Sequence, residues 1–299
     1  MTKPMQRFSF LVCAVVGTFA LSSLARAQDV VVGVNAWYRP PGMSQEEFIK
    51  QLADNGVKTI RISFPGSVDF IIQAYSHGIG TLAIVPPHAG SKAKPRHSSF
   101  DIPLSECNPE EFTAAVKPML DQLEAAGVRL TGLELGNEIN ISRFNGDLPD
   151  SGSGRMLGLA DLNNPNDSEA STVASGYRTY IKIAAALKDL RDHSKLNQHT
   201  PIIAGASAHM SSRGSKSLDG KLAASLLDSI KFLRQNGLDK FVDGYAVHVY
   251  PGLDPSRTTA TRIASLGQDI FSECRADKPC WLAEWGIPNA NQRGRAAAM

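Results

Sequence analysis

The sequence predicts an α/β fold of the (β/α)8-barrel (TIM-barrel) type in a single domain. Three observations support this prediction. Short runs of apolar and β-branched residues alternate with helical periods along the chain. A glycine recurs where a helix is expected to pass into the next strand. The loops after strands are longer than the turns after helices, and in a (β/α)8 barrel the loops after the strands build the functional face.

Seven strands are expected in succession. The first is nearly all apolar, as a strand buried on both faces should be. The expected strands are Val30–Trp37, Lys58–Phe64, Gly80–Pro86, Thr131–Asn140, Pro201–Ser207, Val242–Tyr250 and Cys280–Trp285.

Helical periods fill the intervals between these strands. Ser44 and Glu47 have the spacing of a capping box, which predicts a helix start at Ser44. The expected helices are Ser44–Asn55, Ser67–His77, Pro109–Ala126, Glu169–Asp192, Asp219–Asn236 and Ser256–Glu273.

Four of the helices are followed by a glycine and then an apolar residue. Glycine at this position supplies a left-handed cap, and the apolar residue packs back on the helix. The repetition indicates a series of βα units. The four glycines are Gly56, Gly78, Gly127 and Gly237.

A doubly wound open sheet is the alternative fold. It would carry a glycine-rich phosphate loop after the first strand, and the segment Trp37–Gly42 (Trp-Tyr-Arg-Pro-Pro-Gly) is not such a loop. A barrel, however, needs an eighth strand, and only 15 residues follow Glu284. Asn289–Met299 has no strand-like run, so we expect a barrel that is incomplete at its C-terminus or completed by a partner.

The N-terminus has the pattern of a secretory signal. Lys3 and Arg7 precede the apolar run Phe8–Leu24, and Ala25–Ala27 (Ala-Arg-Ala) is a cleavage site. We therefore expect residues 1–27 to be a signal peptide, residues 28–299 to be the barrel domain, and the protein to be secreted or periplasmic. An uncleaved membrane anchor is the alternative.

Net charge and cysteine positions give expectations about partners, metals and disulfides. Cleavage would remove three basic residues and no acid, so the net charge of +2 would become −1, and we expect no nucleic-acid partner. We also expect a monomer and no cofactor. No His-x-His pair or cysteine cluster is present, so we expect no metal site. Cys274 and Cys280 flank a short turn and could form a disulfide, which would leave Cys107 unpaired; three free thiols are the alternative.

Polar and aromatic side chains collect near the C-terminal ends of the expected strands. Two of them are glutamates, which end the fourth and the seventh strand. Trp37 and Trp285 are candidates for stacking on a sugar, with core packing as the alternative. The remaining candidates are Arg61, His88, Asn137, Glu138, His248, Tyr250 and Glu284.

Three motifs carry a resemblance to a known family. They are Leu135–Glu138 (Leu-Gly-Asn-Glu), His248–Pro251 (His-Val-Tyr-Pro) and Leu282–Gly286 (Leu-Ala-Glu-Trp-Gly). They resemble clan A glycoside hydrolases, and most closely the family 5 group of cellulases and mannanases. The resemblance covers Val30 to about Pro288. The family also carries a tryptophan at the end of strand eight, and this chain has no such strand after Trp285.

The resemblance implies a role for each candidate. Glu138 would be the general acid/base, Glu284 the nucleophile, and Asn137 a ligand of the sugar 2-hydroxyl. Arg61 and Tyr250 would contact Glu284 and keep it ionised. His88 and His248 would line the subsite for the sugar that is cleaved.

These roles predict a retaining hydrolase of β-linked poly- or oligosaccharides. Two carboxyls about 5–5.5 Å apart let one attack the anomeric carbon while the other protonates the leaving oxygen. The alternative is an impaired barrel that only binds carbohydrate. The shape of the subsites would depend on the loops Pro87–Cys107, Ser142–Asp167 and Ser207–Leu218.

Overall fold

The computed structural model describes residues 33–36, 39–64, 66–96, 100–150, 154–208, 212–213, 216–217, 220–250 and 272–285. Several expectations therefore concern residues outside the described part of the chain. These are the signal peptide at 1–27, Trp37, the eighth-strand region at 289–299, and the helix expected at 256–273 except for its last two residues.

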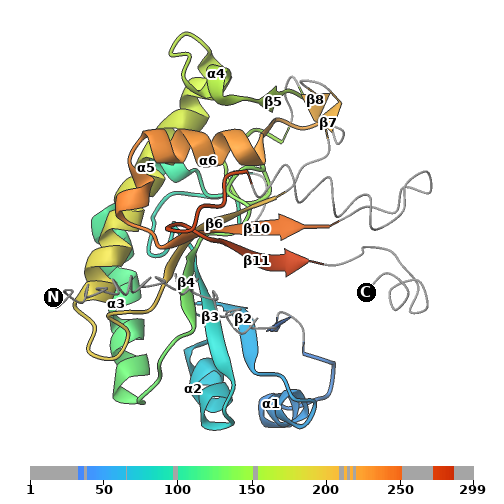
Figure 1. Ribbon diagram of the computed structural model, residues 1–299, viewed down its shortest axis with the longest axis vertical. Coiled ribbons are helices and arrows are strands. Elements are labelled where there is room, and N and C mark those ends of the chain that lie inside the picture. Colours follow the sequence, from blue (N-terminus) through green and yellow to red (C-terminus); the bar gives the residue numbers. More distant parts are fainter. Residues whose placement is uncertain are drawn as a thin grey trace, which may run out of the picture. The chain divides into compact units, whose positions relative to one another are not determined.

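One parallel sheet holds seven strands in the same order as in the sequence (Figure 1). A doubly wound sheet would reverse its strand order partway, so the strictly sequential order excludes that alternative. The fold is an incomplete (β/α)8-type barrel, and β1 and β11 form its edges in the part of the chain described. The strands are β1 (Val34–Asn35), β2 (Thr59–Ser63), β3 (Gly80–Val85), β4 (Gly132–Leu135), β6 (Ile202–Ala208), β10 (Gly244–Val249) and β11 (Cys280–Trp285).

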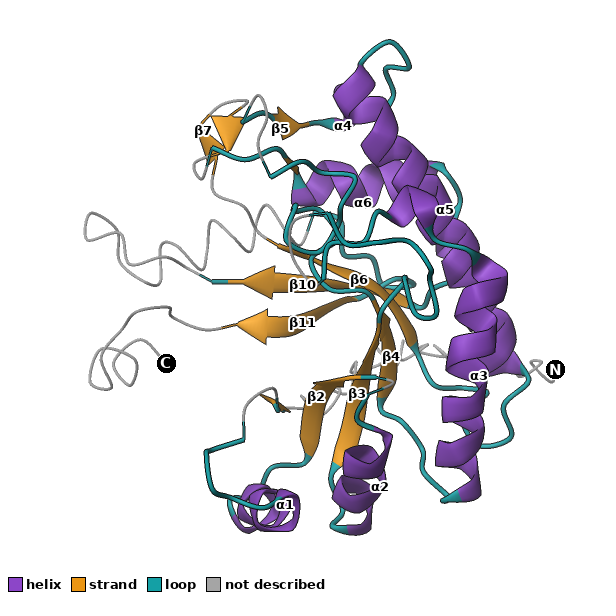
Figure 2. Ribbon diagram, turned by 180° about the vertical axis from the view of Figure 1, so that it is seen from behind, coloured by secondary structure: helices purple, strands orange, loops and turns teal. Residues whose placement is uncertain are grey.

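The helices that connect these strands contact one another in chain order. Helix α1 contacts α2, α2 contacts α3, α3 contacts α5, and α5 contacts α6 (Figure 2). This helical layer packs on the sheet through α2 against β3 and α6 against β6. The helices are α1 (Gln45–Asp54), α2 (Val68–Ser76), α3 (Pro109–Ala125), α4 (Leu159–Leu162), α5 (Ser168–Asp192) and α6 (Leu226–Gln235), with short 3-10 helices η1 (Leu104–Glu106) and η2 (Leu238–Lys240).

Two small sheets lie in the loops that follow β4 and β6. β5 (Met156–Leu157) pairs in parallel with β9 (Ala223–Ala224), and β7 (Ser212–Arg213) pairs antiparallel with β8 (Lys216–Ser217). The sequence pattern predicted none of these strands, because two residues are too few to show a period.

The expected capping box and the four expected glycine caps are confirmed. The Ser44 hydroxyl accepts a hydrogen bond from the Glu47 amide, and the Glu47 carboxylate accepts one from the Ser44 amide. The four expected glycines are left-handed, with φ between 74° and 92°. At the first of them the Val57 amide donates to the Leu52 carbonyl, which is the backbone bond of a Schellman cap.

Three expectations are wrong. The first strand, expected at Val30–Trp37 and buried on both faces, is in the described residues only β1 (Val34–Asn35), and both of its residues are exposed at the edge of the sheet. The helix expected from Asp219 begins at Leu226, because Ala223 and Ala224 are held in β9 and Ser225 caps the helix instead. The strand expected to reach Asn140 ends at Leu135, because Gly136 turns the chain with a φ of 86°. The residues after Gly136 are therefore in a loop.

The strands separate two apolar layers. Ile60, Ala83 and Leu133 point to the helices and belong to the main core, while Leu82, Ile203 and Ala246 form a smaller cluster on the opposite face of the sheet. Successive side chains of a strand alternate between faces, so polar residues in register with the smaller cluster share the inner face. This face holds the candidate site.

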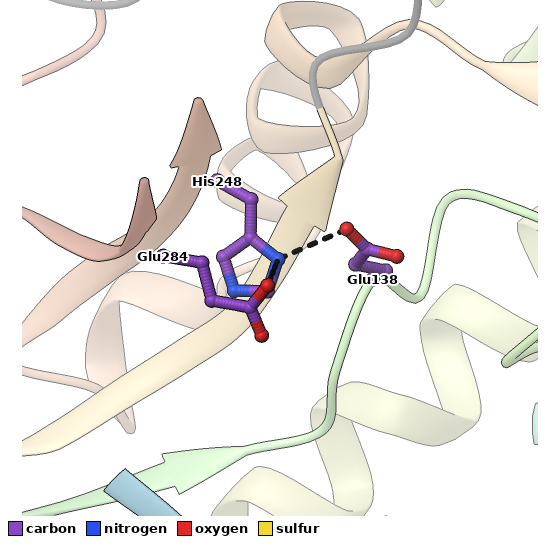
Figure 3. Close-up of side chains that lie close together, drawn as sticks. All are labelled: Glu138, His248 and Glu284. Atoms are coloured by element: carbon purple, nitrogen blue, oxygen red, sulfur yellow. Dashed lines mark hydrogen bonds and ion pairs between the residues drawn. The ribbon is translucent and has the colours of Figure 1, made fainter. Parts of the chain in front are cut away.

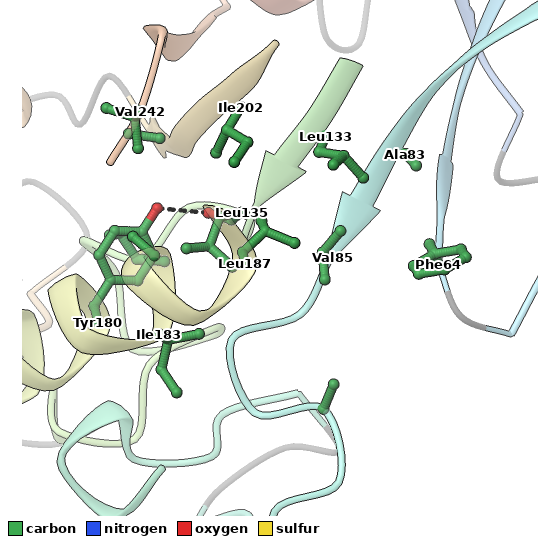
Figure 4. Packing of buried hydrophobic residues seen from close by; sticks show 14 of the residues in the cluster. Phe64, Ala83, Val85, Leu133, Leu135, Tyr180, Ile183, Leu187, Ile202 and Val242 are labelled. Carbon is green, nitrogen blue, oxygen red and sulfur yellow. Dashed lines mark hydrogen bonds between the residues drawn. The ribbon is translucent and has the colours of Figure 1, made fainter. Parts of the chain in front are cut away.

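The buried Tyr180 joins helix α5 to the sheet (Figure 4). Its hydroxyl donates to the Leu135 carbonyl at 2.7 Å and accepts from the Gly205 amide at 2.5 Å. A Cβ at Gly205 would lie 2.5 Å from the same carbonyl, so the glycine lets β4, β6 and α5 approach at this point. The contact fixes the end of β4 just before the candidate site.

We predict that Tyr180→Phe lowers the free energy of unfolding by about 1–3 kcal/mol, because it leaves a buried amide and a buried carbonyl without this partner. Urea denaturation of the variant and the parent measures the difference. The control is Tyr75→Phe on α2, where Tyr75 is 37% exposed and the change should stay below about 0.5 kcal/mol. Equal midpoints for all three proteins would contradict the anchoring role of Tyr180.

Candidate active site

Arg61 of β2 lies at the centre of the inner face. It is only 4% exposed, and its guanidinium forms a two-bond pair with Glu134 of β4, with Nε and Nη2 at 2.6 and 2.7 Å from the two carboxylate oxygens. Nη2 also donates to Asn137 Oδ1 at 2.9 Å, and Nη1 donates to Glu284. One buried cation thus joins β2, the end of β4 and β11.

Opposing effects act on the pKa of Arg61. Burial alone would lower it, but the charges of Glu134 and Glu284 and their hydrogen bonds outweigh burial and raise the pKa. Arg61 is therefore cationic although it is buried, and the two carboxylates compensate its charge.

Glu134 is a site residue that the sequence reasoning missed. It is fully buried within the apolar strand Gly132–Leu135 and faces inward because its neighbours Leu133 and Leu135 face the helices. The signal that could have found it is a lone carboxylate inside an apolar strand. Such a residue needs a cationic partner, and Arg61 is the charged residue inside β2.

Glu284 reaches the inner face through an irregularity in β11. Val247 pairs with Leu282 and the next residue, His248, pairs with Glu284, so Ala283 is an extra residue in β11. Trp281 and Ala283 pack on the inner cluster, and strict alternation would turn Glu284 to the other face. The bulge shifts the register by one residue and turns the carboxylate inward.

Glu138 lies on the loop after β4 in a rare backbone conformation. Its φ of 44° is left-handed, and it is the only such non-glycine residue in the described ranges. The Ile141 amide donates to the Glu138 carbonyl at 3.1 Å. The buried Asn140 donates to the Ala208 and Ala224 carbonyls at 2.9 Å each, which ties the loop to the end of β6. These anchors hold the strained residue in place.

His248 of β10 lies between the two glutamates (Figure 3). Its Nδ1 is 3.0 Å from a Glu138 oxygen and 3.5 Å from a Glu284 oxygen, and its Nε2 is 3.2 Å from Arg61 Nη2. Since Arg61 is always a donor, this arrangement fits a neutral imidazole that accepts at Nε2 and donates from Nδ1. One oxygen of each carboxylate lies within 4.8 Å of the other.

Tyr250 follows β10, and its hydroxyl donates to Glu284 at 2.5 Å. Burial and the negative charge of Glu284 raise the pKa of Tyr250, so the phenol remains a donor at neutral pH. His88, in the turn after β3, lies in the same cleft, and burial lowers its pKa. His88 is therefore neutral at neutral pH.

A cleft of about 460 Å³ opens over these residues. It is large enough for a small ligand. Trp285 is 50% exposed and does not line it, and Trp37 lies outside the described residues. The residues that line the cleft are Ser63, Ile84, Pro86, Pro87, His88, Phe100, Asn137, Glu138, Ile139, Arg143, Phe144, Tyr250 and Glu284.

Glu138, His248 and Glu284 are also the three described residues whose donor atoms are close enough to share a metal ion. Glu284 already accepts hydrogen bonds from the Arg61 cation and from Tyr250. A divalent ion bound there would lie beside a buried positive charge, and like charges in a buried site repel strongly. The donor set therefore fits a pair of hydrogen-bonded carboxylates better than a metal site.

The pairing of the cysteines agrees with the disulfide expected from the sequence. Cys274 and Cys280 form a disulfide with Cα atoms 5.2 Å apart, at the start of β11. Cys107 is a free thiol, and burial raises its pKa to about 12. It lies at the end of η1 and takes no part in the candidate site.

In the described residues, no helix combines the length and apolar character needed to cross a membrane.

Comparison with known proteins finds distant similarity. No family model and no curated protein matches the chain. Among solved structures, the chain is similar to an exo-β-1,4-mannosidase from Opitutaceae bacterium strain TAV5, with 16% identity, 90% of this chain and 50% of that one covered, and a TM-score of 0.49. The present chain therefore spans half of the length of that mannosidase.

Two further structures are similar at the same level. A fungal β-1,4-galactanase has 15% identity and a TM-score of 0.45, and a family 1 β-glucosidase from Thermotoga maritima has 12% identity and a TM-score of 0.45. Both matches cover 82% of this chain and 67% of the other. The chain is also similar to D-psicose 3-epimerase, at 9% identity and a TM-score of 0.42, which is named for an activity other than glycoside hydrolysis. Likeness this distant assigns no activity.

We predict that Glu134→Gln lowers the free energy of unfolding by about 2–3 kcal/mol. The change removes one charge of a buried pair, and Glu284 still compensates part of the charge of Arg61. Urea denaturation measures the loss. The matched control is Glu106→Gln, whose pair with Arg96 is about half exposed and should contribute less than about 1 kcal/mol. Equal losses in the two variants would contradict the central role of the buried pair.

Proposed function

We propose that this chain is a retaining glycoside hydrolase of β-linked poly- or oligosaccharides, with Glu138 as general acid/base and Glu284 as nucleophile. The observation that carries the proposal is the opposed pair of carboxylates at the ends of β4 and β11, held by Arg61, His248 and Tyr250 at the wall of one cleft.

The separation of the carboxylates supports a retaining reaction. One oxygen of Glu138 lies within 4.8 Å of one oxygen of Glu284. Retaining glycosidases hold their carboxyls about 5–5.5 Å apart, whereas inverting enzymes need about 6.5–9.5 Å to admit a water molecule. An approach this close supports the retaining separation over the inverting one.

The reaction proceeds in two displacements. Glu284 attacks the anomeric carbon, while Glu138 donates its proton to the oxygen of the leaving sugar; the glycosidic bond breaks and a glycosyl ester of Glu284 forms. Water then attacks the same carbon and transfers a proton to Glu138. The ester bond breaks, which restores both carboxyls and releases the sugar with its original configuration.

The environments of the two glutamates differ in the way these roles require. Glu284 accepts hydrogen bonds from a permanent cation and from a phenol, which are the partners expected of a nucleophilic carboxylate. In the described part of the chain Glu138 contacts neither of these groups, and its side chain lies 3.0 Å from His248 Nδ1. The nucleophile is therefore the carboxylate beside Arg61, and the acid is the one on the loop.

We predict that Glu284→Ala reduces hydrolysis of aryl β-glycosides by at least about 10³-fold, because the covalent step needs this carboxylate. The rate is measured with a panel of glucosides, mannosides, xylosides and uronides. Azide added to Glu284→Ala should restore turnover and give the α-glycosyl azide, since it attacks from the face that the carboxylate vacated. Azide added to Glu138→Ala should give the β-azide.

Glu110→Ala, at an exposed position on α3, is the control and should keep the parent rate. Treatment with EDTA should also leave the rate unchanged, because no step uses a metal. An unchanged rate in Glu284→Ala would overturn the assignment. Loss of activity with EDTA and its return with a divalent ion would replace it with a metal-dependent hydrolase. Binding of oligosaccharides without hydrolysis by the parent chain would support a carbohydrate-binding role instead.

We further propose that the protein is exported. The pattern of residues 1–27 and the Cys274–Cys280 disulfide both support this, because disulfides persist in oxidising compartments. We predict that the chain recovered outside the cytoplasm of the expressing cell begins at Gln28, as N-terminal sequencing would reveal. An N-terminus at Met1 in the exported protein would contradict cleavage after Ala27.

A further inference from the structure

Two phenylalanines form one wall of the cleft beside Glu138. The rings of Phe100 and Phe144 have centroids 6.2 Å apart and are tilted by 45°, and both line the cleft. Phe100 is 53% exposed, although most side chains of this size among the described residues are buried. The guanidinium carbon of Arg143 lies 5.5 Å from the centre of the Phe144 ring. We call Phe100 and Phe144 the aromatic wall.

The aromatic wall is built from two loops that are bonded to each other. Phe100 precedes η1 and Phe144 lies in the loop after β4. The Ser105 amide donates to the buried Asp147 carboxylate at 2.9 Å, and the Gly146 amide donates to the Ile102 carbonyl at 3.3 Å. A Cβ on Gly146 would lie 2.2 Å from the carbonyl oxygen of Asp101, so the loops are in close contact. The wall is therefore preformed.

The same loop places Phe144 relative to Glu138. Consecutive turns connect the two residues, with the Ile141 amide donating to the Glu138 carbonyl and the Phe144 amide donating to the Ile141 carbonyl, at 3.1 and 3.2 Å. The buried Asn145 donates to the Ile139 carbonyl at 2.9 Å. Glu138 and Phe144 therefore belong to one rigid segment.

The roles of the glutamates determine which part of a substrate meets this wall. Glu138 gives its proton to the leaving oxygen, so the leaving group must lie on the Glu138 side of the cleavage point, away from Glu284. The face of a pyranose ring that presents C–H groups is apolar and packs on aromatic rings, as an apolar ligand face does in other aromatic-lined sites.

We propose that Phe100 and Phe144 form the subsite for the leaving group, where they stack on the apolar face of a second pyranose ring. Arg143, which also lines the cleft, lies at the edge of this subsite. The wall selects substrates whose leaving group is a sugar. This inference rests on the proposed function, since it uses Glu138 as the acid.

The test compares two substrates that share the cleaved sugar. One is the β-linked disaccharide of the sugar that the parent chain hydrolyses best, and the other is the corresponding β-glycosyl fluoride, whose leaving group is too small to reach the wall. We expect Phe144→Ala and Phe100→Ala each to lower kcat/KM for the disaccharide by roughly tenfold and to change it for the fluoride by less than about twofold. Transfer from the fluoride to an added sugar acceptor should fall in parallel.

Tyr75→Ala, which removes a partly exposed aromatic ring on α2 outside the cleft, is the matched control and should leave both substrates unaffected. Phe100 is the more exposed ring, so Phe100→Ala keeps the test valid if Phe144→Ala disturbs folding. Equal losses on both substrates, or no loss on either, would overturn the assignment of the wall. If the parent chain hydrolyses the fluoride, a negative result overturns only the subsite proposed for Phe100 and Phe144. If the parent chain hydrolyses neither substrate, the proposed function is overturned as well.

Discussion

The buried ion pair of Arg61 and Glu134 is the constraint on which the candidate site depends. A lone charge on the inner face of an apolar sheet would be costly, and the pair makes two charges tolerable there. The pair uses only part of the guanidinium. The remaining donors reach Asn137 and Glu284, so the same cation also positions these two residues of the site. The same ion pair therefore stabilises the interior of the barrel and positions the residues of the site.

Two departures from regular backbone structure bring the carboxylates to face each other. The extra Ala283 in β11 turns Glu284 inward, and the left-handed conformation of Glu138 turns it out of the line of β4. Both irregularities cost free energy, and both occur where well-ordered neighbours hold them: the ladder with β10 in one case and the Asn140 bonds in the other. Strain of this kind is expected at a functional site rather than in the supporting core.

In the described part of the chain, the loop after β4 and the segment before α3 are held together by buried polar side chains. Asn140, Asn145 and Asp147 are buried, and their side chains satisfy backbone groups of neighbouring segments. This network holds the loop after β4 against the loop before α3, and it gives the cleft one wall of defined shape. A site whose walls are preformed does not have to order them when a ligand binds. The proposed subsites for the two sugars therefore share a single rigid frame.

The sequence by itself determined the order of the seven strands of the main sheet, the order of α1, α2, α3, α5 and α6, the glycine caps and the neighbourhood of the candidate residues. These follow from local patterns: periodicity, capping spacings and glycines after helices. The sequence predicted that Arg61, Asn137, Glu138, His248, Tyr250 and Glu284 lie together, because strand ends meet at one edge of a parallel sheet. Only the tertiary structure decided the role of Glu134, the inward turn of Glu284 and the pairing of Phe100 with Phe144. Each depends on contacts between distant segments, and no local pattern encodes a bulge or a contact between two loops.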